Sequence, residues 1–173
     1  AMAGIGTYTK IEGFAFLPIT SFMMALTTFV SQNRGAKEYE RARKGARFGL
    51  VCSVSLAEII GILIILFATP LMRLFVDNPQ VIEYGVQRAH YATILFFMLA
   101  YSHGVSAVLR GVGKSIVPMV VMLVCWCLVR VTLLTTLNMM FHNIIFVYMI
   151  YPFTWTLSSI VFFLYYRKIN WQE

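Results

Sequence analysis

Four ionisable side chains lie inside long apolar stretches of the sequence: Lys10, Glu12, Glu58 and Arg130. A charge in such a stretch is costly unless it faces protein, water or a partner, so these residues are the first candidates for function. A carboxyl group there could load and release a proton, which is the chemistry of an ion-coupled pathway. A structural interpretation is open for each of the four as well.

Lys10 and Glu12 lie about 200° apart around a helix, so they cannot pair with each other and at least one should face a cavity. Lys10 could instead extend to the outer membrane interface. Glu58 follows Ser55 by one helical turn, and this hydroxyl could bond the carboxyl. Glu58 is then either a coupling acid or a silent, hydrogen-bonded one.

Arg130 follows Trp126 by one helical turn, close enough for a cation–π contact, and we favour a structural anchor over a pathway role. His103 stands alone, and a lone helical histidine is more often packed and hydrogen-bonded than a proton relay. Aromatic and Met side chains could form an adaptable surface for flat amphipathic cations, although packing or lipid contact explains them equally well. From this group we select Phe16, Met24 and Tyr101 as pathway candidates.

The elements that must position these residues are membrane-spanning helices. Each apolar stretch is near the length of about 20 residues that a spanning helix requires, and the alternation typical of barrel strands is absent. We predict one transmembrane domain over 1–173: all-α, a polytopic transmembrane helix bundle of about five helices, with a cytoplasmic basic loop at 34–44. The expected helices cover about 1–33, 43–69, 80–109, 115–137 and 143–167.

Composition supports a membrane protein and excludes other classes. Hydrophobic residues make up 60% and charged residues 12%, and the mean hydropathy is +0.77, so no soluble domain is expected. The net charge of +7 lies in short loops beside apolar stretches, which favours membrane lipid over nucleic acid as a partner. The sequence has no HExxH motif, metal-ligand spacing or convergent Ser/His/Asp set, so we expect neither a metal nor an enzyme.

Charge asymmetry predicts the orientation. Residues 31–47 carry six of the fourteen basic residues, and such loops stay on the cytoplasmic side. The connection at 110–114 and the end of the chain near 167–168 then lie in the cytoplasm too. The opposite side holds Arg73 and Arg88 in its connections. We therefore expect a multi-pass protein of the cell (inner) membrane with a cytoplasmic carboxyl terminus.

Several residues predict local backbone features. Pro18 and Pro152 fall inside expected helices, where we predict bends. Gln32, Asn33 and Gly35 are typical of a helix end, with Gly35 supplying the permissive backbone.

Four segments together resemble the multidrug and toxic compound extrusion (MATE) family: GIGTYTKIEGFAFLPI at 4–19, MALTTFVSQNRGA at 24–36, ERAR at 40–43 and VLRGVGK at 108–114. They are similar to the family's eighth helix with its cytoplasmic loop and to the end of its tenth helix. Within them, or beside them in the bundle, we take as structural positions Pro18, Gln32, Asn33, Gly35, Arg110, Gly111 and Arg130.

The family fold has twelve helices in two lobes around a central cavity, so the resemblance implies that this chain is most of helices eight to twelve, one incomplete lobe. It implies efflux of organic cations, drugs or toxic amphipathic compounds in exchange for protons or sodium ions, with no other cofactor. The missing amino-terminal lobe would come from a longer protein or from a second chain. We expect a fragment, because residues 1–13 are typical of a helix already under way.

One departure concerns the coupling ion. A branch of the family has an Asp about three turns before the Arg-Gly motif of the tenth helix, where this chain has Phe, Met, Leu and Ala at 97–100. Coupling would then rest on the missing lobe or on residues such as Glu12 or Glu58, and the choice between proton and sodium stays open.

Two other functions remain alternatives. One is a lipid or polysaccharide flippase of related fold, and the other is a non-transporting membrane fragment or partner subunit.

Overall fold

Helices are the regular elements of the computed structural model, which describes residues 2–141 and 144–171. No strand occurs within these two ranges, as the sequence predicts for an all-α protein. The elements in chain order are α1 (Met2–Gly35), α2 (Tyr39–Leu66), α3 (Ala68–Arg73), α4 (Pro79–Thr93), α5 (Phe96–Gly111), α6 (Ile116–Met122), the π-helix η1 (Leu123–Val129), α7 (Arg130–Phe141) and α8 (Ile144–Tyr166).

The described helices provide four or five membrane spans. Four are long and apolar enough by themselves: α1, α2, the rod formed by α6, η1 and α7, and α8. Helices α4 and α5 qualify together as a fifth span, bent by 56° at a short break. This confirms the predicted polytopic bundle of about five helices.

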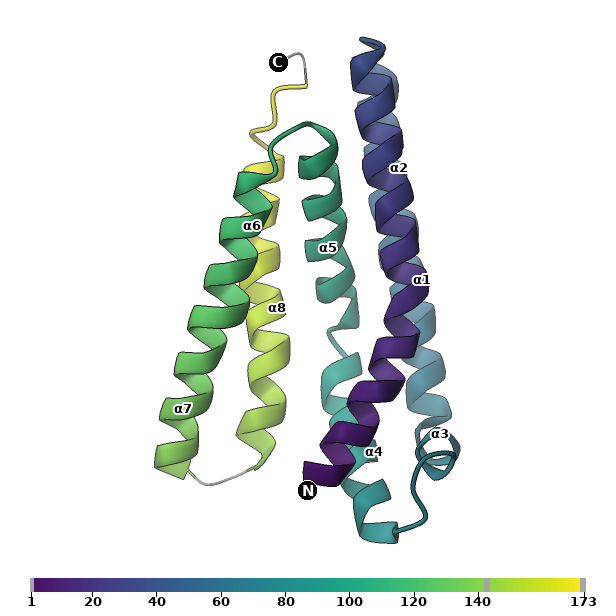
Figure 1. Ribbon diagram of the computed structural model, residues 1–173, viewed down its shortest axis with the longest axis vertical. Coiled ribbons are helices and arrows are strands. Elements are labelled where there is room, and N and C mark those ends of the chain that lie inside the picture. Colours follow the sequence, from purple (N-terminus) through teal and green to yellow (C-terminus); the bar gives the residue numbers. More distant parts are fainter. Residues whose placement is uncertain (1, 142–143, 172–173) are drawn as a thin grey trace.

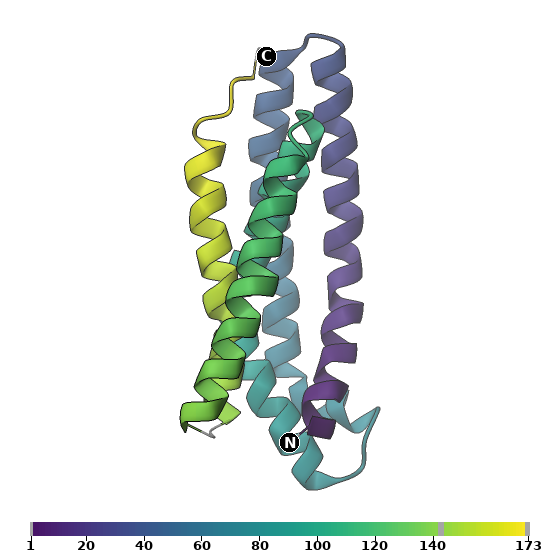
Figure 2. The same ribbon diagram turned by 60° about the vertical axis from the view of Figure 1, so that its left-hand side comes forward.

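The long helices run side by side along one axis (Figure 1 and Figure 2). Helices α1 and α2 pack against each other, the rod α6–η1–α7 packs against α8, and α5 contacts α1, α2 and α8. Helix α5 is therefore the centre of the bundle. The α1–α2 turn, the α5–α6 turn and the end of α8 lie at one end, which we call the basic end (Figure 1). The start of α1 and the loop before α4 lie at the other end.

Side chains sort as expected for a protein in lipid. Two buried apolar clusters fill the bundle: one includes Ile19, Phe96 and Trp155, and the other includes Leu109 and Phe162. Many large apolar side chains face outward instead, which is the arrangement that a hydrocarbon environment favours.

Helix α1 approaches α5 and α2 closely through glycines. A Cβ added at Gly111 would lie 2.7 Å from the Cβ of Val30, and the neighbouring Thr27 hydroxyl donates to the carbonyl of Ala107 at 3.1 Å. On α2, Gly45 and Gly49 face side chains of α1 in the same way. These contacts explain why small residues recur at the helix crossings.

The basic loop expected at 34–44 is shorter than predicted. Helix α2 begins at Tyr39, so the connection is a turn of Ala36, Lys37 and Glu38. Lys44 and Glu40 are one helical turn apart and form an ion pair of 2.7 Å. Lys, Arg and Glu are good helix formers, so the helix continues beyond its apolar part into the polar zone.

The backbone prediction for Gly35 is wrong. Helix α1 includes Gly35, and the left-handed residue of the turn is Lys37, with φ of 62°. The chain reverses through bonds from the amide of Ala36 to the carbonyl of Gln32 and from the amide of Glu38 to the carbonyl of Asn33. Gln32 and Asn33 thus lie at a helix end, as predicted, but the strained position falls two residues later.

The helix expected at 80–109 is interrupted. Ile94 and Leu95 separate α4 from α5, although neither a proline nor a glycine marks the break. The hydroxyl of Thr93 donates back to the carbonyl of Ala89, a bond that competes with the helix ladder. Pro18 and Pro152 lie inside continuous helices, and the bends expected there stay predictions.

Candidate functional site: a charged cluster beside a membrane hollow

An acid on α1 meets an arginine on α4 inside the bundle. The Oε2 atom of Glu12 lies 4.0 Å from the guanidinium of Arg88, and the two side chains are 17% and 3% exposed. The helices can come this close because Gly4 faces the backbone of α4, where an added Cβ would lie 2.6 Å from the carbonyl oxygen of Val81. The pair therefore links α1 to α4 in a region from which water is largely excluded.

Tyrosine rings surround the Arg88 guanidinium. Its central carbon lies 4.3 Å from the ring centre of Tyr151, 5.5 Å from that of Tyr8 and 6.0 Å from that of Tyr148. Such faces attract a cation electrostatically and replace part of its hydration. Because Nε has no hydrogen-bond partner in the described part of the chain, these rings and Glu12 supply much of the arginine's stabilisation.

Arg130 approaches the same tyrosine from the other side of the bundle. It donates to the hydroxyl of Thr154 at 2.7 Å, and its guanidinium carbon lies 4.6 Å from the Tyr151 ring centre and 5.1 Å from that of Trp126. The contact with Trp126 was predicted from the sequence. The side chain thus points into the bundle.

The π-helix η1 ends directly before Arg130. Single wide turns of this kind occur mostly as local insertions within α-helices and frequently at functional sites. The indole of Trp126, within η1, donates to the hydroxyl of Ser158 at 3.2 Å. Ser158 is itself bonded to Ser102 at 2.9 Å, so a buried hydroxyl network fixes the indole.

Of this cluster, Glu12, Trp126, Arg130 and Tyr151 line a hollow of about 290 Å³ between α1, α5, η1, α7 and α8. Its polar lining includes Glu12, Arg130 and His103, and its apolar lining includes Phe16 and Trp155. The His103 ring stands edge-on between Phe16, 4.8 Å away, and Trp126, 5.1 Å away. Flat aromatic walls with a few charged groups are typical of a site for small organic molecules.

Charge in the cluster is unbalanced. Glu12 is one carboxylate facing two guanidiniums, and within the described residues Arg130 forms no ion pair of 4.0 Å or less. In a low-dielectric setting an excess cation is costly unless another anion or an aromatic face compensates it. The hollow therefore favours a ligand that can stack on its aromatic side chains and that carries a group able to pair with either Glu12 or Arg130.

The structure brings together some of the predicted residues and separates others. Glu12, Phe16 and Arg130 line the hollow. Lys10 and Met24 are exposed on the outside of α1. Glu58 lies on α2, outside the lining of the hollow. Its Oε2 is buried with no partner in the described part of the chain, so this oxygen accepts no bond from Ser55. Tyr101 packs against the apolar cluster that includes Leu109 and Phe162.

Sequence reasoning missed Arg88 and Tyr151. Arg88 was assigned to an outer connection, but it is 2% exposed within α4. One signal could have found it: Gly85, Arg88, Ala89 and Ala92 recur at helical spacing, and all four are buried. An arginine on a stripe of small residues indicates a packed face.

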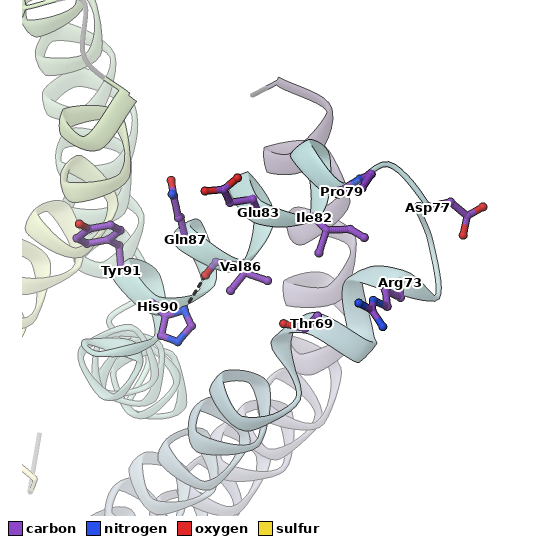
Figure 3. A pocket seen from close by; sticks show the side chains of 10 residues that line it. All are labelled: Thr69, Arg73, Asp77, Pro79, Ile82, Glu83, Val86, Gln87, His90 and Tyr91. Atoms are coloured by element: carbon purple, nitrogen blue, oxygen red, sulfur yellow. Dashed lines mark hydrogen bonds between the residues drawn. The ribbon is translucent and has the colours of Figure 1, made fainter.

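A second, larger hollow of about 870 Å³ lies at the end opposite the basic end, between α3 and α4 (Figure 3). Asp77 is on the connecting loop and points away from α4, and His90 bonds the carbonyl of Val86 at 2.8 Å (Figure 3). The charged side chains do not converge. This hollow offers less chemistry than the cluster around Glu12.

The spans and the charged interior site define a polytopic membrane protein with a polar site within its helical bundle. The model of the MatE family matches residues 1–136, and the chain belongs to this family.

Relatives of this chain are named for multidrug resistance or for transport. It is 31% identical over 121 residues to "Probable multidrug resistance protein NorM" of Thermotoga maritima, a match that covers 70% of this chain and 26% of that protein. "Probable multidrug resistance protein YoeA" of Bacillus subtilis is 23% identical over 175 residues, which is 100% of this chain and 37% of that protein. "FAD transporter" of Shewanella oneidensis is 30% identical over 84 residues, covering 49% and 19%. The matched part of this chain spans much less than two thirds of the length of each of these relatives.

Proposed function

We propose that this chain is the carboxy-terminal part of a secondary active transporter that expels organic cations, drugs or toxic amphipathic compounds in exchange for protons or sodium ions. Family membership supports transport, and the hollow around Glu12 supports a small-molecule site within the membrane. We further propose a cell (inner) membrane location, with the basic end and the carboxyl terminus in the cytoplasm.

The hollow is the observation that carries the proposal. At about 290 Å³ it is slightly smaller than the roughly 300–1,000 Å³ of ligand pockets, so it fits one face of a larger cavity. The other face would come from an amino-terminal lobe, in the same polypeptide or in a second chain. Phe16, Trp126 and Tyr151 offer rings on which a flat compound can stack.

Glu12 is the residue that we propose for ion coupling. An ion that binds the carboxylate of Glu12 competes with Arg88, so binding of that ion weakens the link between α1 and α4. Binding of the ion and binding of the substrate can therefore each shift the equilibrium between the linked and the unlinked arrangement of α1 and α4. Hard metal cations take several oxygen ligands, and the two guanidiniums repel them, so the geometry favours a proton over sodium.

The test is proton-driven efflux of ethidium from proteoliposomes, using the full-length protein that carries this sequence. We expect Glu12→Gln to reduce efflux at least tenfold. The matched control is Glu83→Gln, an acid on exposed α4 surface outside the hollow. Normal gradient-dependent efflux by Glu12→Gln would remove this acid from the mechanism.

A second candidate function is transport of a flat anionic compound. Two guanidiniums facing one carboxylate favour an anion, and one relative is named FAD transporter. Arg130→Gln separates the two candidates. A larger loss of FAD transport than of ethidium transport supports the anionic substrate, whereas loss of ethidium transport alone supports the cationic one.

A further inference from the structure

A second group of arginines lies at the basic end, independent of the Glu12 cluster. Arg43 and Arg47 of α2 and Arg167, directly after α8, line a hollow of about 470 Å³. The other lining residues are Tyr166, Ile169, Asn170 and Trp171.

The aromatic wall of this hollow is built from packed residues. Beyond α8 the chain turns through bonds from the amide of Lys168 to the carbonyl of Tyr165 and from the amide of Ile169 to that of Tyr166. Ile169 is buried, and Trp171 stands edge-on to Tyr166 with ring centres 6.3 Å apart. The segment after α8 is thus held against the bundle, facing the first turns of α2.

The three arginines line one hollow, and no acidic side chain is among its lining residues. Arg43 and Arg47 are one turn apart on one face of α2. Within the described residues, neither they nor Arg167 forms an ion pair of 4.0 Å or less. Three like charges around one hollow repel each other, and a bound anion would offset this repulsion. Guanidinium groups match phosphate oxygens particularly well, because they donate in a planar fork.

The surroundings of the hollow indicate where the anion comes from. Tyr and Trp are enriched where a helix leaves the hydrocarbon, and basic groups beside a span attract anionic lipids. Arg167 lies over the ring of Phe163 at 5.8 Å, and Phe163 is an exposed apolar side chain on α8. A lipid with its phosphate in the hollow could therefore lay its acyl chains along the outer face of α8.

We propose that this hollow binds the phosphate of an anionic phospholipid headgroup and that the bound lipid links the start of α2 to the end of α8. The proposal concerns a site other than the transport hollow, and its test measures no transport.

The test is native mass spectrometry of the purified full-length protein with phosphatidylglycerol, and separately with inorganic phosphate. The double variant Arg43→Gln/Arg47→Gln removes two arginines of the hollow. The double variant Arg41→Gln/Lys44→Gln is the matched control, because it removes two charges from the same turns of α2 but outside the lining. Arg167→Gln provides a second test from another element.

We expect wild type and control to retain phosphatidylglycerol. Arg43→Gln/Arg47→Gln and Arg167→Gln should each show at least fivefold fewer phosphatidylglycerol adducts. Equal retention by all four proteins, or an equal loss in the control, would overturn the proposal. Inorganic phosphate binding without lipid binding would overturn the lipid as the source of the anion. Thermal unfolding of each variant confirms that it is folded before its lipid adducts are compared.

Discussion

Removal of Arg88 should destabilise the bundle by an amount that its contacts define. Arg88→Met keeps much of the side-chain volume but removes the charge from a site with 3% exposure. The close Tyr151 contact at 4.3 Å contributes about 1 kcal/mol, and the two contacts at 5.5 and 6.0 Å contribute about 0.5 kcal/mol each. Glu12 then lacks its counter-charge, which costs about 1–2 kcal/mol at its partial exposure. The expected loss is about 3–4 kcal/mol.

A double-mutant cycle isolates the Glu12–Arg88 term. In Glu12→Gln/Arg88→Met the carboxylate is absent, so we expect the double variant to be more stable than Arg88→Met by about 1 kcal/mol. The assay is reversible unfolding of the full-length protein in mixed micelles, followed by tryptophan fluorescence. The reasoning is refuted if Arg88→Met has the same free energy of unfolding as wild type. It is also refuted if the double variant loses as much stability as the two single variants combined.

Two further predictions concern packing and the hydroxyl network. Gly111→Val places a side chain against the backbone of α1 near Val30 and should lower the free energy of unfolding by about 1–3 kcal/mol in the same assay. The control Gly113→Asn, at a left-handed turn position with φ of 81°, should cost less. Equal losses in the two variants would contradict the close α1–α5 contact. Ser102→Ala removes the bond to Ser158 and should lower the free energy of unfolding by about 1 kcal/mol. It should also shift the tryptophan emission, because Ser158 accepts a bond from the indole of Trp126. Unchanged stability and emission would show that this hydroxyl network does not form.

The fold was largely predictable because its dominant signal is local. Long apolar stretches require helices in lipid, whatever their neighbours are. The break at Ile94 and Leu95 was not predictable in this way, because no proline or glycine occurs there. The π-helix η1 likewise has no local signature in its sequence, LVCWCLV.

The candidate site was predictable in part. Charges within apolar stretches directed attention to Glu12 and Arg130, and both line the hollow. Arg88 was missed because it lies in a stretch of low hydropathy, where a basic residue is usually in a loop. Its burial follows from tertiary packing of small residues between α1 and α4, which a count of loop charges cannot represent.

The central claim, that substrate occupies the hollow beside Glu12, is tested most directly by protection of a cysteine placed there. In a full-length protein whose Cys52, Cys125 and Cys127 are replaced by Ser, Phe16→Cys is labelled with N-ethylmaleimide with and without ethidium. Ser31→Cys, on exposed α1 surface near the basic end, is the control. We predict that ethidium slows labelling of Phe16→Cys severalfold and leaves Ser31→Cys unchanged. Labelling of Phe16→Cys at the same rate with and without ethidium would contradict the account.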